Sequence, residues 1–175
     1  MSKIAYDLSK MRAVVFDIDG VLSPATVSLG ENGIPCRMAN LRDGYAMQRA
    51  IQTGTLDLCI ISSADAPGLR ERFRNLGVKD IYLNAGDKFE ILKYWMERRG
   101  YLPEETAYVG DDIPDLSCMR YVGLPVAPSD AAPECRDAAR YITKAAGGYG
   151  VARELLEQIL KVRRVWNTET NKENA

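Results

Sequence analysis

The sequence predicts an α/β fold, a Rossmann-like doubly wound parallel sheet with helices on both faces. Short apolar runs alternate along the 175 residues with segments of helical spacing, and such alternation is typical of parallel sheets. The first run is apolar at every position from Ala13 to Phe16, as expected for a strand that helices cover on both faces. We expect a single domain over residues 1–166, followed by a short polar segment, 167–175.

The pattern changes after the first strand. Residues 23–38 consist of short extended pieces around Gly30-Glu31-Asn32-Gly33, which predicts a β-hairpin flap. The interval between Asp19 and the next helix is too short for an inserted cap domain, and so is the interval between Lys88 and Asp111. We therefore expect a small flap and no cap domain.

Capping residues and glycine stops mark three helices. They are expected at Gly44–Gln52, capped by Asp43 and stopped by Gly54; at Leu69–Leu76, closed by Gly77; and at Lys88–Arg99, closed by Gly100. Further strands are expected at Leu56–Ile61, Ile81–Leu83, Thr106–Val109 and Leu124–Val126.

The last predicted helix carries an apolar stripe. Its members recur at helical spacing: Val151, Leu155, Leu156, Ile159 and Val162. Such a stripe packs either on the core or against another subunit, and we favour the core. The polar tail from Asn167 to Ala175 is expected to be disordered, or to become ordered only against a partner.

The net charge, the cysteines and the apolar runs of the sequence indicate what kind of partner and cellular location to expect. The formal net charge of −1 favours neither nucleic acid nor an acidic membrane surface, so a small-molecule substrate is expected. Cys36, Cys59, Cys118 and Cys135 have no metal-binding spacing. The sequence has no signal-peptide pattern and no long apolar span, which predicts a cytoplasmic protein with reduced thiols.

Polar residues follow several predicted strands. Asp17 and Asp19 come directly after the first strand, and side-chain alternation allows both to face the same side. Two close carboxylates resist joint ionisation, so this pair needs a metal, a proton-transfer role, or both. Ser62-Ser63, Lys88 and the run Asp111-Asp112-Ile113-Pro114-Asp115 follow later strands. The carboxyl ends of parallel strands share one crevice, so we expect one common pocket.

These motifs resemble those of the haloacid dehalogenase superfamily of phosphatases. The resembling residues are Asp-x-Asp-Gly-Val at 17–21, Ser62, Lys88 and Gly-Asp-Asp-x-x-Asp at 110–115. Within the superfamily, the runs at 40–45 and 107–112 and the glycines at 147–148 resemble the capless phosphatases of 3-deoxy-D-manno-octulosonate (KDO) 8-phosphate. The resemblance implies a role in lipopolysaccharide biosynthesis and a homotetramer in which flaps and neighbouring subunits cover each active site.

The chemistry of phosphate esters suggests a role for each residue. Asp17 is the candidate nucleophile, because a carboxylate can divide the reaction into formation and hydrolysis of an acyl phosphate. Asp19 would protonate the leaving oxygen and then activate water, a role that the absence of histidine favours. Lys88 would neutralise phosphoryl charge, while Ser62 donates a hydrogen bond to the same group. An all-oxygen site suits Mg²⁺, with carboxylates from Asp17 and Asp111; the backbone carbonyl of Asp19 is added by resemblance alone.

The substrate contacts rest on the resemblance. It implies the following substrate-binding residues: Asp19, Arg42, Asp43, Gly44, Arg72 and Lys88. The neighbouring Arg70 and Arg74 are more simply explained as solvated helix charges. Close relatives usually carry arginines where this chain has Gln48, Ala64 and Tyr149. The residues expected to carry out catalysis are therefore all present, whereas residues expected to select the substrate differ from those of the relatives.

The sequence leaves three alternatives to a KDO 8-phosphate phosphatase. The same catalytic residues would serve the 9-phosphate of a nine-carbon keto-deoxy sugar acid. Receiver-like signalling modules also combine an acidic metal pocket with a hydroxyl residue and a lysine, but their phosphorylated aspartate lies on a middle strand. A catalytically idle sugar-binding subunit is disfavoured by the presence of Asp19.

Overall fold

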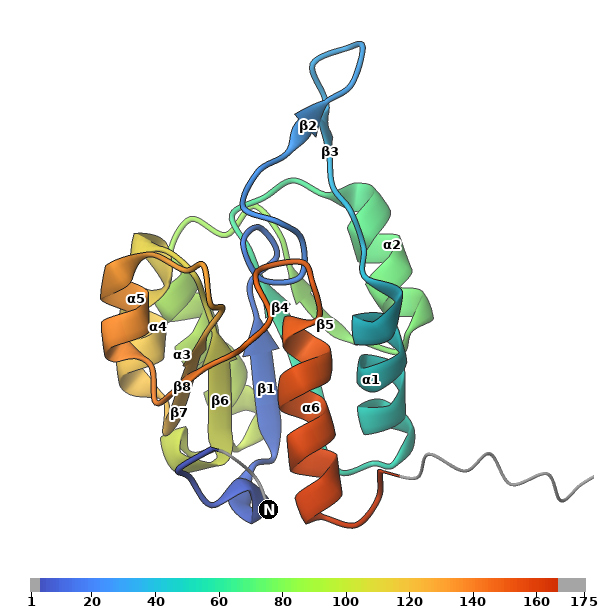
Figure 1. The fold of residues 1–175 in the computed structure, drawn as a ribbon. Helices are drawn as coiled ribbons and strands as arrows, with labels where there is room; N and C mark the ends of the chain where they lie inside the picture. The colour runs from blue at the N-terminus through green and yellow to red at the C-terminus, as the bar shows by residue number, and fades with distance from the viewer. Residues whose placement is uncertain (1–3, 167–175) are drawn as a thin grey trace, which may run out of the picture.

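A six-stranded parallel sheet forms the centre of the molecule (Figure 1). The computed structural model describes residues 4–166. The strand order is β5-β4-β1-β6-β7-β8. The strands are β1 (Ala13–Phe16), β4 (Asp57–Ile61), β5 (Asp80–Tyr82), β6 (Thr106–Val109), β7 (Leu124–Ala127) and β8 (Tyr141–Ile142). The predicted doubly wound sheet is therefore confirmed.

Helices cover both faces of the sheet. One face packs against α1 (Leu41–Gln52), α2 (Pro67–Asn75) and α6 (Val151–Val162), and the other against α3 (Lys88–Arg99), α4 (Leu116–Tyr121) and α5 (Pro133–Ala138). Each face of the sheet has its own hydrophobic core, and alternate residues of β1 pack into each of them. Val14 and Phe16 pack against α1, α2 and α6, whereas Ala13 and Val15 pack against α3, α4 and α5. Short 3₁₀ turns complete the chain as η1 (Leu8–Lys10), η2 (Pro103–Glu105) and η3 (Ile113–Asp115).

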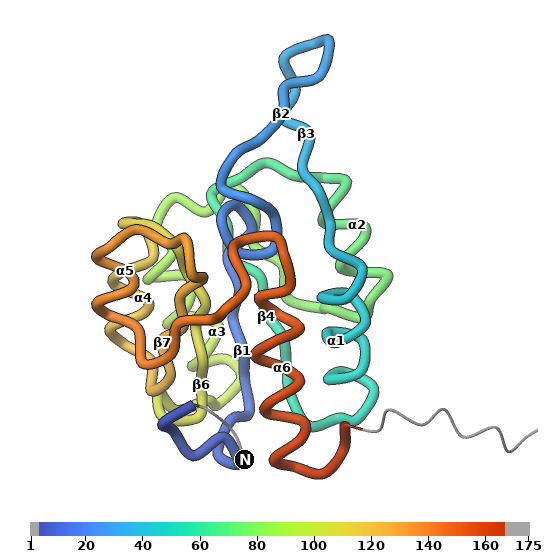
Figure 2. The backbone as a smooth tube through the Cα atoms, viewed as in Figure 1, coloured from blue at the N-terminus to red at the C-terminus, as the bar shows by residue number. Residues whose placement is uncertain are grey.

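The predicted flap is a β-hairpin of β2 (Ser28–Leu29) and β3 (Pro35–Cys36). The two strands pair antiparallel, with Ser28 opposite Cys36. In Figure 2 the hairpin projects beyond the carboxyl end of β1, clear of the helices. Its strand residues are exposed, so the hairpin packs little apolar surface on the body of the protein.

Helix ends differ in places from the expectation. Asn40, not Asp43, caps α1: its side chain accepts hydrogen bonds from the backbone N–H groups of Arg42 and Asp43. The first turn thus starts earlier than predicted and buries Asp43. By contrast, α3 has the predicted bounds and ends at Gly100, whose positive φ of 70° suits the glycine cap.

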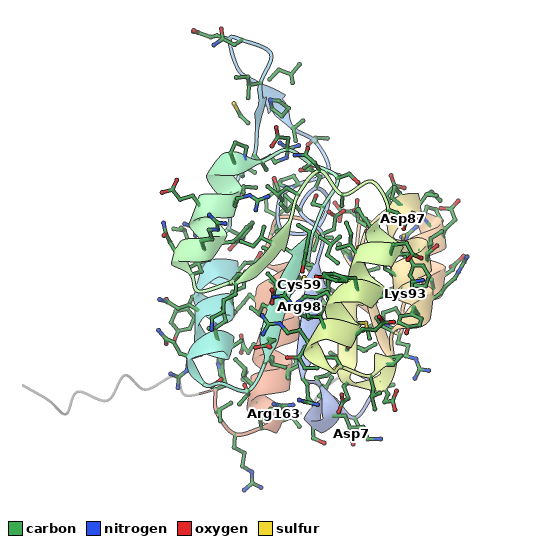
Figure 3. The ribbon with its side chains drawn as sticks, turned by 180° about the vertical axis from the view of Figure 1, so that it is seen from behind. Asp7, Cys59, Asp87, Lys93, Arg98 and Arg163 are labelled. Carbon is green, nitrogen blue, oxygen red and sulfur yellow. The ribbon has the colours of Figure 1, made fainter. Side chains whose placement is uncertain are left out.

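The last helix packs mainly on the core, as predicted. Val151, Leu155, Leu156 and Ile159 are fully buried, whereas Val162 is 42% exposed. Beyond this helix Arg163 donates hydrogen bonds to the carbonyls of Ser9, Met11 and Thr55. Figure 3 shows Arg163 and Asp7 together at the end of the molecule opposite the hairpin. The predicted disordered tail lies outside the described residues.

Among residues 4–166, no helix combines the length and the apolar character that crossing a bilayer requires.

Candidate active site

The carboxyl ends of β1, β4 and β6 lie on the side of the sheet from which the hairpin projects (Figure 1). Residues at these ends line one pocket of about 250 Å³. β1 is paired in parallel with both neighbours, so that Phe16 lies opposite Ile60 and Val109. The residues that follow these three strands therefore lie side by side. The pocket is lined by Asp17, Asp19, Ala25, Ser62, Ser63, Ala64, Lys88, Asp111, Asp112, Pro114 and Asp115. All the predicted catalytic and metal-binding residues are among them.

Lys88 joins two of the carboxylates. Its Nζ donates to Asp17 Oδ2 at 2.7 Å and to Asp115 Oδ1 at 2.8 Å. The side chain of Lys88 is only 5% exposed. Burial acts to lower the pKa of Lys88, but the charges of Asp17 and Asp115 outweigh it and raise that pKa above its ordinary value. The ammonium group is therefore charged and fixed in position.

Both carboxylate oxygens of Asp115 accept hydrogen bonds from neighbouring groups. Besides Lys88, its carboxylate accepts from the Tyr108 hydroxyl at 2.8 Å and from the backbone N–H groups of Asp111 and Asp112 at 3.0 and 3.4 Å. Asp112 itself is exposed; its side chain accepts from the adjacent Ile113 N–H, and its backbone carbonyl accepts from the Asp115 N–H. Asp115 thus holds both the loop after β6 and Lys88 in place.

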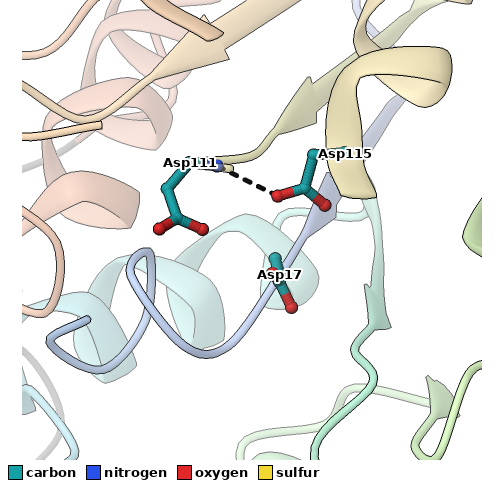
Figure 4. A group of neighbouring side chains, drawn as sticks. All are labelled: Asp17, Asp111 and Asp115. Atoms are coloured by element: carbon teal, nitrogen blue, oxygen red, sulfur yellow. Dashed lines mark hydrogen bonds between the residues drawn. The ribbon is translucent and has the colours of Figure 1, made fainter. Parts of the chain in front are cut away.

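Three carboxylates converge where a cation would be needed (Figure 4). Oxygen atoms of Asp17, Asp111 and Asp115 all lie within 4.8 Å of one another. Burial, followed by repulsion from Asp115, raises the pKa of Asp17 to about 6, against the hydrogen bonds of Lys88 and Ser62. The same two causes raise the pKa of Asp111 to about 7. The cluster is short of positive charge, as expected of a site built for a divalent cation.

Glycines allow the loops to approach this cluster closely. Gly20 has φ +79°, and a Cβ there would lie 1.8 Å from Asp111 Oδ2. A Cβ on Gly147 would lie 2.1 Å from the carbonyl oxygen of Gly20. Side chains at either position would push the first loop away from Asp111.

The two serines after β4 differ in their surroundings. Ser62 is 2% exposed, lines the pocket, and accepts a hydrogen bond from the Ala64 N–H. Ser63 donates to the carbonyl of Ala85. Neither caps α2, which begins after Ala66 without a side-chain cap. Ser62 is therefore available to the pocket.

Arg37 is a site residue that the sequence analysis missed. From the hairpin its Nε donates to Asp19 Oδ1 at 2.7 Å and its Nη2 to Asp19 Oδ2 at 2.9 Å. These hydrogen bonds raise the pKa of Arg37 above its ordinary value. Only the folded path of the hairpin brings Arg37 to Asp19, so no local motif marks it.

Other predicted substrate contacts lie outside the pocket lining. Asp43 is 3% exposed, and its Oδ1 accepts from the Arg153 N–H at the start of α6. Gly44 lets α1 approach α2, because a Cβ there would lie 3.0 Å from Arg72 Nη2. Arg42 is exposed on the first turn of α1. The structure groups Gly44 with Arg72 but brings none of these four to Asp17.

Comparisons with known proteins identify the relatives of this chain. Residues 73–155 match the haloacid dehalogenase-like hydrolase family. The chain is 36% identical over 150 residues to the KDO 8-phosphate phosphatase KdsC of Escherichia coli K12, covering 86% of this chain and 79% of that protein.

Solved structures show the same fold. The KDO 8-phosphate phosphatase of Yersinia pestis aligns with a TM-score of 0.85 at 33% identity, covering 90% of this chain and 85% of the other. The Moraxella catarrhalis enzyme, in complex with magnesium ion, phosphate ion and KDO, aligns with a TM-score of 0.83 at 29% identity, covering 88% of each chain. The chain therefore belongs to the KDO 8-phosphate phosphatase family of haloacid dehalogenase-like hydrolases.

Proposed function

We propose that the protein is a Mg²⁺-dependent phosphatase that hydrolyses KDO 8-phosphate to KDO and phosphate in lipopolysaccharide biosynthesis. The observation that carries the proposal is the position of Asp17, which lies between the buried Lys88 and the carboxylate of Asp111 at the base of the pocket. The curated relative and the Moraxella structure add the substrate class.

Hydrogen bonds to both carboxylate oxygens hold Asp17 in a fixed orientation. Oδ1 accepts the Ile18 N–H at 2.6 Å, and Oδ2 accepts from Lys88. Attack on phosphorus by one oxygen would form a phosphoaspartate and release the sugar. Lys88 would then face the phosphoryl oxygens as a fixed positive charge that needs no rearrangement during the reaction. Ser62 would donate a hydrogen bond to the same phosphoryl group.

Asp19 would serve as the general acid and base. It lies two residues from Asp17 at the mouth of the pocket, and its side chain is 36% exposed. A proton delivered to the sugar oxygen would be recovered from the water that attacks the phosphoaspartate. Such proton transfer typically contributes about 10²- to 10⁴-fold.

Mg²⁺ would be held by Asp17 and Asp111, with the backbone carbonyl of Asp19 as a third protein ligand. Asp115 is less suited to bind it, because Lys88, Tyr108 and two backbone N–H groups already occupy its oxygens. When bound, the cation would supply positive charge that offsets the carboxylates and the phosphate.

The proposal is tested by phosphate release from three compounds: KDO 8-phosphate, the nine-carbon 9-phosphate and an aryl phosphate. Each is assayed with Mg²⁺ and after treatment with EDTA, with Asp17→Asn as the background. We expect Mg²⁺-dependent turnover that favours KDO 8-phosphate. Preference for the nine-carbon acid would change the substrate, and a stable phosphoaspartate without turnover would favour the receiver-like alternative.

We also propose a homotetramer in the cytoplasm. Large apolar side chains are exposed on and around the hairpin: Leu29, Ile34, Met38, Leu41 and Tyr149. Such a group favours burial against neighbouring subunits. Light scattering after gel filtration tests the subunit number, and a monomeric mass would contradict it. Fractionation of cells that express the protein tests the location.

A further inference from the structure

Arg37 turns inward from an exposed hairpin. Its neighbours Cys36 and Met38 are exposed, whereas the Arg37 side chain is only 11% exposed. Nη1 donates to the backbone carbonyl of Asp65 at 3.3 Å, while Nε and Nη2 hold Asp19. The guanidinium therefore bridges the loop after β1 and the loop after β4, one residue beyond Ala64.

This contact engages both oxygens of Asp19. The arrangement is bidentate, with Nε on Oδ1 and Nη2 on Oδ2, which is the strongest geometry for a guanidinium and a carboxylate. While both oxygens accept from Arg37, this contact fixes the orientation of the Asp19 carboxylate. Exchange of Asp19 for another anion on Arg37 would free Asp19 to turn toward the leaving oxygen.

The charge of the pocket indicates which anion that is. Among the described lining residues, five are aspartates and one, Lys88, is a cation. Lys88 is already bound to Asp17 and Asp115 at the phosphoryl end. A sugar acid phosphate carries a carboxylate as well as its phosphate, and that carboxylate would meet no cation of the lining. Arg37 is not itself in the lining, but it contacts Asp19, which is, and this contact places its guanidinium close enough to supply one.

We propose that Arg37 is a specificity-determining residue that binds the carboxylate of the sugar acid and releases Asp19 as it does so. The inference rests on the proposed function, since it requires a substrate with a second anionic group. The guanidinium would stay paired in both states, first with Asp19 and then with the substrate. Phosphate esters without a second anion would leave Asp19 bound to Arg37 and react slowly.

The test compares two substrates in four proteins: wild type, Arg37→Ala, Arg37→Lys and the control Arg74→Ala, which removes an exposed arginine of α2. The quantity measured is kcat/KM for KDO 8-phosphate divided by kcat/KM for an aryl phosphate. Loss of a charge-assisted pair should lower this ratio about 10- to 100-fold in Arg37→Ala. Arg37→Lys should recover part of the loss, and Arg74→Ala should retain the wild-type ratio.

A second measurement uses the product alone. The dissociation constant of KDO, which has the carboxylate but no phosphate, should rise by a similar factor in Arg37→Ala when measured by calorimetry. An unchanged ratio, an equal loss on both substrates, or unchanged KDO binding would overturn the role of Arg37. Absence of KDO 8-phosphate turnover by the wild type would instead overturn the proposed function, and KDO binding would still decide whether Arg37 binds the carboxylate.

Discussion

Replacing Asp43 with asparagine should make the protein more stable at neutral pH. Asp43 is 3% exposed, its Oδ1 accepts one hydrogen bond from the Arg153 N–H, and its Oδ2 has no hydrogen-bond partner among the described residues. Burial raises the pKa of this carboxyl to about 6, although the Arg153 hydrogen bond and charge oppose the rise. Ionised Asp43 is therefore a cost to the folded state.

The size and sign of the effect follow from the two pKa values. Between pH 3.8 and about 6 the folded protein binds more protons at Asp43 than the unfolded chain does, so stability falls as pH rises. The rise of the Asp43 pKa from 3.8 to about 6 lowers the free energy of unfolding by about 3 kcal/mol above pH 7 and by about 0.5 kcal/mol at pH 4. Asparagine keeps an acceptor for the Arg153 N–H and removes this ionisation.

Urea unfolding at pH 4.5, 6 and 8 measures the difference. We expect the gain in unfolding free energy of Asp43→Asn to grow with pH toward about 3 kcal/mol. The control Asp137→Asn changes an exposed residue of α5 and should stay within about 0.5 kcal/mol of wild type throughout. A difference that does not vary with pH would refute the reasoning. Phosphatase activity of the same variant tests the predicted substrate role, which Asn at position 43 should impair.

Three further substitutions test the site. Lys88→Met leaves two buried carboxylates without their cation, so the unfolding free energy at pH 7 should fall by about 3 kcal/mol; an unchanged urea midpoint would contradict this. Gly20→Ala places a methyl group on Asp111, so kcat should fall at least about tenfold with an unaltered circular dichroism spectrum, and a wild-type rate would show that the loop can yield. Asp19→Asn should lower kcat about 100-fold or more on a sugar phosphate, and less on an aryl phosphate whose leaving group needs less protonation; equal losses would argue against an acid role.

Local signals in the sequence predicted most of the fold. The helix α3 was predicted from end to end because Gly100 supplies a left-handed stop. The predicted start of α1 was wrong because Asn40 and Asp43 are both good N-cap residues. Only the backbone path out of the hairpin decides that Asn40 accepts the first N–H groups of the helix. The short elements α4, α5 and β8 were not predicted, since helices of two turns or fewer and a strand of two residues give too little periodicity to detect.

The site was predictable where residues follow strands. Parallel strands bring their carboxyl ends together whatever the intervening sequence, so the grouping of Asp17, Ser62, Lys88 and Asp111 could be anticipated. Arg37 could not be, because a hairpin can fold toward or away from the sheet without changing its own sequence pattern.

β1 and the hairpin differ in how firmly each is held in the folded molecule. β1 is paired on both sides along its length, so Asp17 keeps its position in any state short of opening the whole sheet. The hairpin is attached to the pocket mainly through one arginine, and it can lift off without disturbing a strand. If Arg37 selects the substrate as proposed, a partly opened molecule would lose discrimination before it loses reactivity, and would react faster with small phosphate esters than the closed form does.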